Sequence, residues 1–124
     1  MRAAIYQELK HLYPVYYVGN VQKTTELPFV ILSFGTPIRT RLGNWQTFYV
    51  SCYAPLGNFA LLDTMCERII AALDKKHIAR LNDENNGVFY VQFDNCTGDD
   101  VENRLNAITR QLNFRVPIFG GNYM

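Results

Sequence analysis

One alternating segment constrains the fold of this 124-residue chain more than any other feature. Between residues 45 and 54, Phe48, Val50 and Cys52 share one side of an extended chain, while threonine, serine and tyrosine share the other. Successive side chains of a β-strand point to opposite faces, so the pattern predicts a strand with one face in an apolar core. Residues 105–118 repeat the alternation and predict a long final strand of the same kind.

A near-continuous apolar run at residues 29–34 predicts a central strand with both faces covered. The turn sequence at residues 42–44 joins it to the strand at 45–54, so the two are expected to form an antiparallel hairpin. Gly35 and Pro37 interrupt the run, and we therefore expect the hairpin to extend into a bent arm before the turn.

Two segments have the apolar spacing of helices. Residues 58–73 carry an apolar stripe behind Asn58, whose side chain can accept a hydrogen bond from a free backbone N–H and so cap the helix. Residues 2–12 show a shorter stripe, and Pro14 ends that helix. Further short strands are expected at residues 15–18, 78–81 and 88–94.

These elements define the expected fold class, an α+β domain with a mainly antiparallel sheet of five or six strands and two helices packed on one face. A composition of 48% hydrophobic and 19% charged residues is that of a globular chain with a core. We expect a single domain over residues 1–119, followed by a flexible tail at residues 120–124.

Charge and cysteine content exclude several classes of protein. A net charge of +1 indicates neither a polyanion nor a polycation partner. Three cysteines without a Cys-x-x-Cys pair argue against a disulfide scaffold or a structural zinc site and favour a reducing compartment. No stretch approaches the roughly 20 apolar residues of a membrane span, and the first residues lack a signal-peptide pattern. We expect a protein made in the cytoplasm, with no membrane partner.

Residues suited to catalysis are few. His11 and His77 lack the spacing of a zinc site or a catalytic triad. Cys52 and Cys66 fall on apolar faces and are interpreted as small core residues, whereas Cys96 lies beside acidic residues that disfavour a reactive thiolate. The sequence therefore predicts that the chain is not an enzyme and has no cofactor.

Four acidic residues gather in an expected loop at residues 94–102. Carboxylate oxygens suit a hard cation, but the spacing of an EF-hand is absent. A solvated acidic loop is the simpler interpretation, and whether the loop binds a cation stays open. The four residues are Asp94, Asp99, Asp100 and Glu102.

The most informative feature is a group of arginine and aromatic residues along the expected hairpin, with more aromatic residues after the final strand. Tyrosine, tryptophan and arginine are the residue types that dominate protein interfaces. The same residues also suit single-stranded nucleic acid, or they form an ordinary surface. We expect a subunit or partner interface, with these candidate residues: Arg39, Arg41, Trp45, Tyr49, Tyr53, Phe119, Tyr123 and Met124.

The order of elements resembles a known family. A short N-terminal helix is followed by Glu26-Leu27-Pro28-Phe29-Val30-Ile31-Leu32, a paired strand ending at Tyr53-Ala54-Pro55, a long helix, and a final Leu112-Asn113-Phe114-Arg115-Val116-Pro117-Ile118. This arrangement resembles the tail terminator proteins of long-tailed bacteriophages, which are also called tail-completion or head–tail joining proteins. The similarity spans nearly the whole chain and lies in element order and short segments.

The resemblance implies a structural virion-assembly protein and not an enzyme. It would form a homo-hexameric ring that caps the tail tube and joins the tube to the head connector, with DNA only as cargo passing through the lumen. Its place would be the head-proximal end of the virion tail, after synthesis in the host cytoplasm. Two alternatives are kept: another head–tail connector or minor capsid protein, and a small nucleic-acid-binding α+β module.

Overall fold

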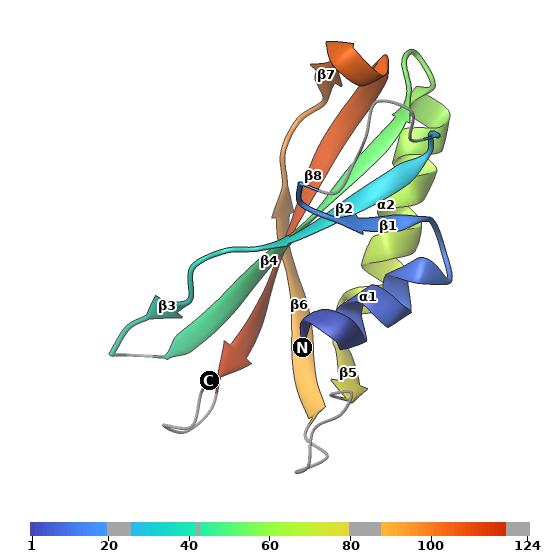
Figure 1. Ribbon diagram of the computed structural model, residues 1–124. Coiled ribbons are helices and arrows are strands. Elements are labelled where there is room, and N and C mark those ends of the chain that lie inside the picture. The colour runs from blue at the N-terminus through green and yellow to red at the C-terminus, as the bar shows by residue number, and fades with distance from the viewer. Residues whose placement is uncertain (20–25, 42, 80–87, 119–124) are drawn as a thin grey trace.

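The computed structural model describes residues 1–19, 26–41, 43–79 and 88–118, without the side chains of residues 79, 88 and 118. Two α-helices, α1 (Arg2–Lys10) and α2 (Phe59–Leu73), and a short 3-10 helix, η1 (Asn103–Leu105), accompany the strands (Figure 1). The strands are β1 (Val15–Tyr17), β2 (Phe29–Phe34), β3 (Ile38–Arg39), β4 (Asn44–Pro55), β5 (Lys76–Ala79), β6 (Val88–Cys96), β7 (Asp100–Glu102) and β8 (Ala107–Ile118).

The strands form one sheet in the order β1-β2-β4-β8-β6-β5, with β3 paired to β4 and β7 paired to β8. Only the β1–β2 pairing is parallel among the described pairs. The α+β class and the mainly antiparallel sheet are therefore confirmed. The described sheet has eight strands and not five or six, because β3 and β7 are short pairings too polar to read as strands from the sequence.

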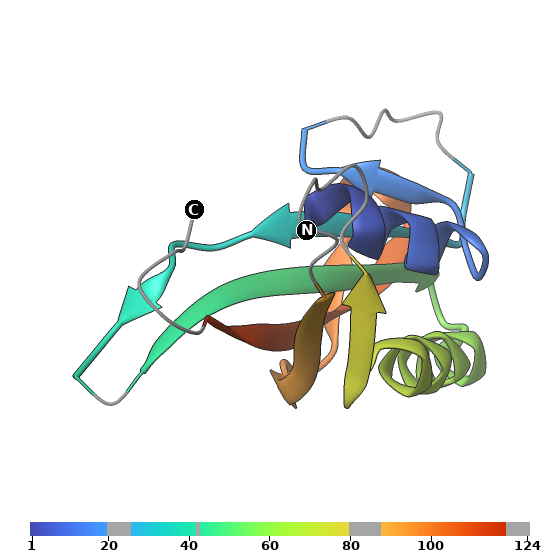
Figure 2. The same ribbon diagram turned by 90° about the horizontal axis from the view of Figure 1, so that it is seen from below.

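Strands β4 and β8 form the axis of the sheet. Each has 12 residues, and they pair along their whole length, from Asn44 opposite Ile118 to Pro55 opposite Ala107. The predicted hairpin is also present, since β2 and β4 pair antiparallel. Beyond Phe34 the hairpin continues as the expected arm, which β3 closes by pairing Ile38 with Trp45. Figure 2 shows this β3 end projecting past both helices.

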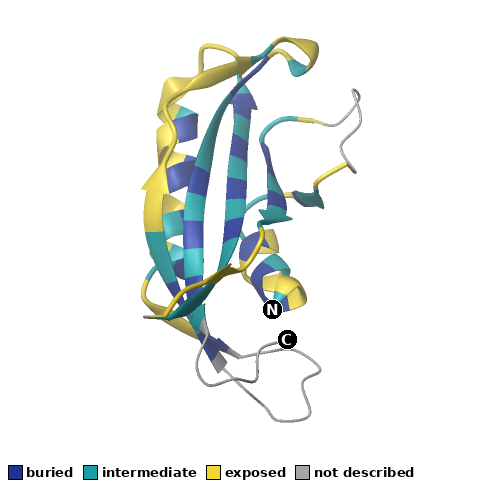
Figure 3. Cartoon of the chain, turned by 90° about the vertical axis from the view of Figure 1, so that its left-hand side faces the viewer, coloured by how far each residue is buried: buried dark blue, intermediate teal, exposed yellow. Residues whose placement is uncertain are grey.

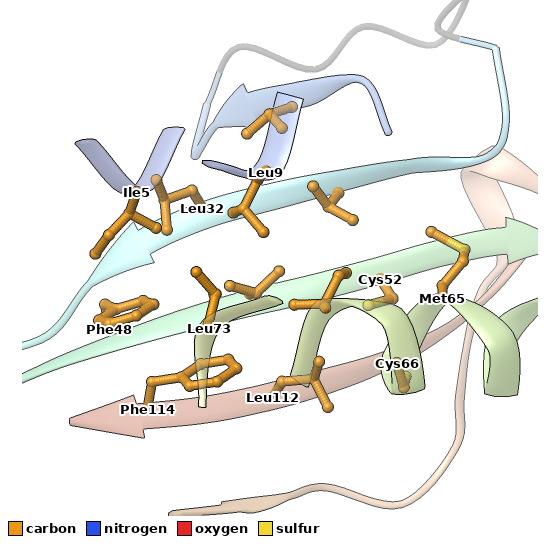
Figure 4. Close-up of a cluster of buried hydrophobic side chains, with 14 of the residues drawn as sticks. Ile5, Leu9, Leu32, Phe48, Cys52, Met65, Cys66, Leu73, Leu112 and Phe114 are labelled. Carbon is orange, nitrogen blue, oxygen red and sulfur yellow. The ribbon is translucent and has the colours of Figure 1, made fainter. Parts of the chain in front are cut away.

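The core lies between the sheet and the two helices. Phe48 of β4 and Phe114 of β8 are register partners and stack with ring centroids 5.1 Å apart (Figure 4). Residues from both helices belong to the same buried cluster, so both helices cover the same face of the sheet. The largest fully buried side chains are Phe29, Phe48, Phe114, Ile5, Leu9, Leu32, Leu62, Met65, Ile69, Leu73, Ile108 and Leu112.

The helix ends follow from local hydrogen bonds. The Asn58 side chain accepts a hydrogen bond from the Leu61 N–H at 3.1 Å, which confirms the predicted cap of α2. Helix α1 ends at Lys10, earlier than the predicted 2–12, because the N–H groups of Leu12 and Tyr13 both donate to the Leu9 carbonyl in a closing turn. Neither described helix has the length and apolar character needed to span a membrane.

The expected limits of the domain remain a prediction. Residues 119–124, which hold the expected tail, lie outside the described part of the chain. So do residues 80 and 81 of the strand expected at residues 78–81, whereas residues 78 and 79 belong to the described strand β5 (Lys76–Ala79).

Candidate interaction surface

The face of the sheet opposite the helices carries the aromatic candidates of the hairpin. Along β4, Trp45, Tyr49 and Tyr53 alternate with buried core residues, so all three lie on this helix-free face. Each is half-buried. Figure 3 shows the resulting bands of buried and half-buried residues along the central strands. The prediction that these three side chains share one face is thus confirmed by the register, while their role as an interface stays a prediction.

At one end of this face, Tyr53 belongs to an aromatic cluster. Its ring stacks on Phe29 of β2, with centroids 4.8 Å apart and planes at 12°. The ring of Tyr16 in β1 packs against the same phenylalanine in a T-shaped arrangement, with centroids 5.6 Å apart. Phe29 is fully buried, but its same-face neighbour Ile31 is only half-buried, so the prediction that both faces of this strand are covered holds only at its start.

At the other end, Trp45 marks the base of the arm. The guanidinium carbon of Arg115, on the same face of β8, lies 5.6 Å from the centre of the indole ring, a distance at which a cation interacts favourably with the ring. Pro117 is the register partner of Trp45 on β8, and Ile38 is its partner on β3. Ile38 is 48% exposed, so this apolar row reaches the surface.

The arm itself is exposed and basic. Arg39 and Arg41 are both exposed, and residues 35–47 contain no acidic residue. The backbone of the turn is fixed by Thr40, whose hydroxyl donates to the Gly43 carbonyl at 2.7 Å and accepts from the Gly43 N–H at 3.0 Å. The remaining predicted interface residues, Phe119, Tyr123 and Met124, lie outside the described residues.

A shallow hollow of about 380 Å³ opens on the helix-free face, at the end of the sheet far from the arm. Burial raises the pKa of Tyr53 in this hollow, and the negative charge of Glu102 raises it further. The hollow is thus a mixed aromatic and acidic environment. Its lining residues are Ser51, Tyr53, Thr97, Gly98, Asp99, Asp100, Thr109, Arg110 and Gln111.

Arg110 connects the hollow to helix α2. Its Nη1 lies 3.0 Å from a carboxylate oxygen of Asp63 in α2, and its Nε donates to Asp99 at 2.9 Å. Hydrogen bonding to Asp99, and then to Asp63, raises the pKa of the guanidinium, so the charge of Arg110 is permanent. Arg110 was not among the residues predicted from the sequence. The signal was present, because Arg110 stands at a core-facing position of β8, between the buried Ile108 and Leu112.

Cys52 and Cys66 are placed as predicted, whereas Cys96, which was expected in a loop, is the last residue of strand β6. Cys52 and Cys66 are buried in the core, and Cys96 is exposed (Figure 4 shows the buried pair). A hydrogen bond to Cys66 and burial raise the pKa of the Cys52 thiol, so it stays protonated. The same hydrogen bond lowers the pKa of Cys66, which acts as the acceptor. Cys66 also lies beside Arg110, and neither thiol lines the hollow.

The acidic segment at residues 94–102 does not converge on one point. Asp94 faces Arg115 at 4.0 Å, Asp99 binds Arg110, and Glu102 accepts from the Arg104 N–H at 3.2 Å. Among the described residues, no three histidine, cysteine or acidic side chains come together as metal ligands.

The described residues therefore form an α+β domain. The helix-free face of its sheet is aromatic and polar, and this face lies between a basic arm and an acidic hollow. The sequence matches no protein-family model and no curated protein. Among solved structures, the fold matches a chain described as "Virion of native gene transfer agent (GTA) particle", with a TM-score of 0.66 and 16% sequence identity. The match covers 97% of this chain and 95% of that one, and at this identity it shows a shared fold.

Proposed function

We propose that this chain is a structural protein of a phage or phage-like virion. The observation that carries the proposal is the shared fold, which extends over 97% of this chain and 95% of a chain from a virion particle. Similarity over nearly the full length of both chains supports the proposal more strongly than a match to a smaller motif would.

Within that class, the role we propose is that of a tail terminator, which caps the tail tube as a ring at its head-proximal end and joins it to the head connector. The resemblance in element order supports this role, and so does the shape of the molecule. Contacts in which one end of a subunit binds the opposite end of the next form a ring when the rotation closes. The number of six identical subunits in the ring follows from the resemblance alone.

A structural role also accounts for the polar residues that are present. Polar side chains of the helix-free face bind one another: Gln111 donates to Asn113 at 2.9 Å, and Asn113 donates to the exposed Asn95 at 2.6 Å. A surface with such an internally bonded polar strip suits a neighbouring protein better than a reacting substrate. We therefore assign no catalytic residue.

A nucleic-acid-binding module remains the alternative, because Arg39 and Arg41 lie near Trp45. The geometry around the indole ring weakens this alternative. Arg115 lies 5.6 Å from the centre of the ring, so a base that stacks on that face would have to displace Arg115. Salt-sensitive binding of single-stranded DNA, lost in Arg39→Ala and Arg41→Ala, would support this alternative.

Removal of the gene from the phage or prophage that encodes it tests the proposed role. Electron microscopy of the lysate should show filled heads and separate tails of irregular or excess length, and expression of the wild-type chain in trans should restore joined virions. Joined virions with tails of normal length in the absence of the chain would contradict the tail terminator role. Empty or malformed heads without any tail defect would point to a connector or capsid role.

A further inference from the structure

The two ends of β4 carry opposite charges. The arm has Arg39 and Arg41 within residues 35–47 and no acidic residue there. The segment at residues 99–102, beside the hollow, has three acidic residues and no basic one. Arg110 neutralises part of that charge through Asp99, but Asp100 and Glu102 add to it on the same face as Tyr53. The charges of the arm and the hollow are therefore complementary.

The arm of one molecule cannot reach its own hollow. Both features belong to the same strand: Asn44 closes the arm, and Tyr53 lines the hollow nine residues later. At about 3.3 Å per residue, this puts them roughly 30 Å apart along β4. Figure 1 shows β3 and β7 at opposite ends of the sheet. A contact between arm and hollow must therefore join two copies of the chain.

The hollow also has the chemistry to receive an arginine. Asp100 and Thr109 are register partners at the β7–β8 edge, which places the Asp100 carboxylate on the helix-free face together with Tyr53. A guanidinium group pairs with carboxylates and packs on aromatic rings. The volume of about 380 Å³ lies at the small end of the range of about 300–1,000 Å³ for ligand sites, so it suits side chains better than a large ligand.

We propose that the arm tip of one copy docks into the acidic hollow of a second copy, with Arg41 meeting Asp100 and the exposed Ile38 covering the adjoining sheet face. The contact is heterologous, because each copy offers an arm at one end and a hollow at the other, so repetition produces a ring or an open filament. This inference deepens the proposed ring and rests on it for its biological meaning, but the contact itself is tested by self-association alone.

Charge exchange on the full chain tests the contact. Arg41→Glu and Asp100→Arg should each weaken self-association by roughly tenfold or more, as measured by sedimentation velocity over a concentration series. The double variant R41E/D100R restores an attractive pair with reversed polarity and should recover most of the wild-type association. Lys76→Glu and Glu67→Lys, at exposed positions of β5 and α2, are the matched controls and should associate like the wild type.

Three outcomes would overturn the contact: wild-type association in both single variants, a double variant no better than the single ones, or a wild-type chain that stays monomeric at its highest soluble concentration. Thermal melting of each variant separates lost association from lost folding. If wild-type rings are seen by electron microscopy and persist in R41E, the docking contact is wrong while the proposed ring stands. If the gene deletion leaves virions intact, the proposed role fails independently of the contact.

Discussion

Gly35 and Tyr49 approach so closely that position 35 has no room for a side chain. A Cβ built on Gly35 would lie 2.6 Å from the Tyr49 hydroxyl and 2.5 Å from the Thr47 hydroxyl. The approach occurs where β2 ends and the arm begins, and the Gly35 N–H donates to the Thr47 carbonyl at 3.1 Å. The half-buried position of Tyr49 thus depends on a glycine that directly follows the neighbouring strand β2.

We expect Gly35→Ala to destabilise the chain by about 1–3 kcal/mol, because a methyl group forces Tyr49 and Thr47 out of place. Denaturant unfolding measures this change. Gly98→Ala is the matched control, since no atom lies within 4 Å of a Cβ at that position. Equal stability of the two variants would mean that the helix-free face does not pack against Gly35.

Arg110→Met should lower the free energy of unfolding by about 1–2 kcal/mol, since it breaks ion pairs that connect β8 with α2 and with the 97–99 segment. Methionine keeps much of the buried hydrocarbon part of the arginine side chain, so the loss of stability measures mainly the contribution of the guanidinium charge. A double-mutant cycle with Asp63→Asn isolates the contribution of the helix pair. Arg104→Met serves as the control, and an equal loss there would assign the effect to general surface charge.

The stacked pair of Phe48 and Phe114 should dominate core stability. Phe48→Ala should cost about 3–5 kcal/mol and Phe48→Leu about 1.5 kcal/mol or less, because alanine leaves a cavity between sheet and helices. Phe59→Ala, at a position that is 50% exposed, should change the stability by less than about 0.5 kcal/mol. Comparable losses at positions 48 and 59 would contradict the assigned core.

Tyr53 makes stability fall at alkaline pH. Its folded-state pKa is raised above the ordinary value of 10.0, by burial and then by Glu102. Below pH 10 the phenol is protonated in both states; above it, the unfolded chain loses the proton first, so the stabilisation disappears as pH rises through the folded pKa. Tyr53→Phe should therefore show a shallower alkaline loss of stability than the wild type.

Urea unfolding at several pH values between neutral and strongly alkaline measures that slope. Tyr16→Phe, which removes a phenol from the same face of the sheet, is the control for general effects of losing one tyrosine hydroxyl. If the slopes of Tyr53→Phe and the wild type coincide, the hollow does not hold the phenol in its neutral form.

Much of the fold could be predicted because alternation and capping are local properties. The alternation of Phe48, Val50 and Cys52 determined the buried face of β4, and Asn58 fixed the start of α2. The bent arm followed from Gly35 and Pro37, which interrupt an apolar run.

Long-range features escaped prediction. The parallel pairing of β1 with β2 involves three residues, from Val15 opposite Val30 onward, too few to specify a partner by pattern. Strand β7 is short and acidic, so it was expected to be a loop. The hollow depends on β7, on β4 and on the contact of Arg110 with Asp99, which no single segment of sequence reveals. The sequence therefore predicted the aromatic residues of the candidate surface but not the charged hollow at its far end.

We propose that copies of this chain close into a ring that caps a tail tube. The most direct measurement is electron microscopy of tail-tube protein from the same particle, polymerised with and without the purified chain. We expect a ring at one end of each tube and tubes that stop lengthening once capped. Tubes with bare ends and the same length distribution in both samples would contradict it.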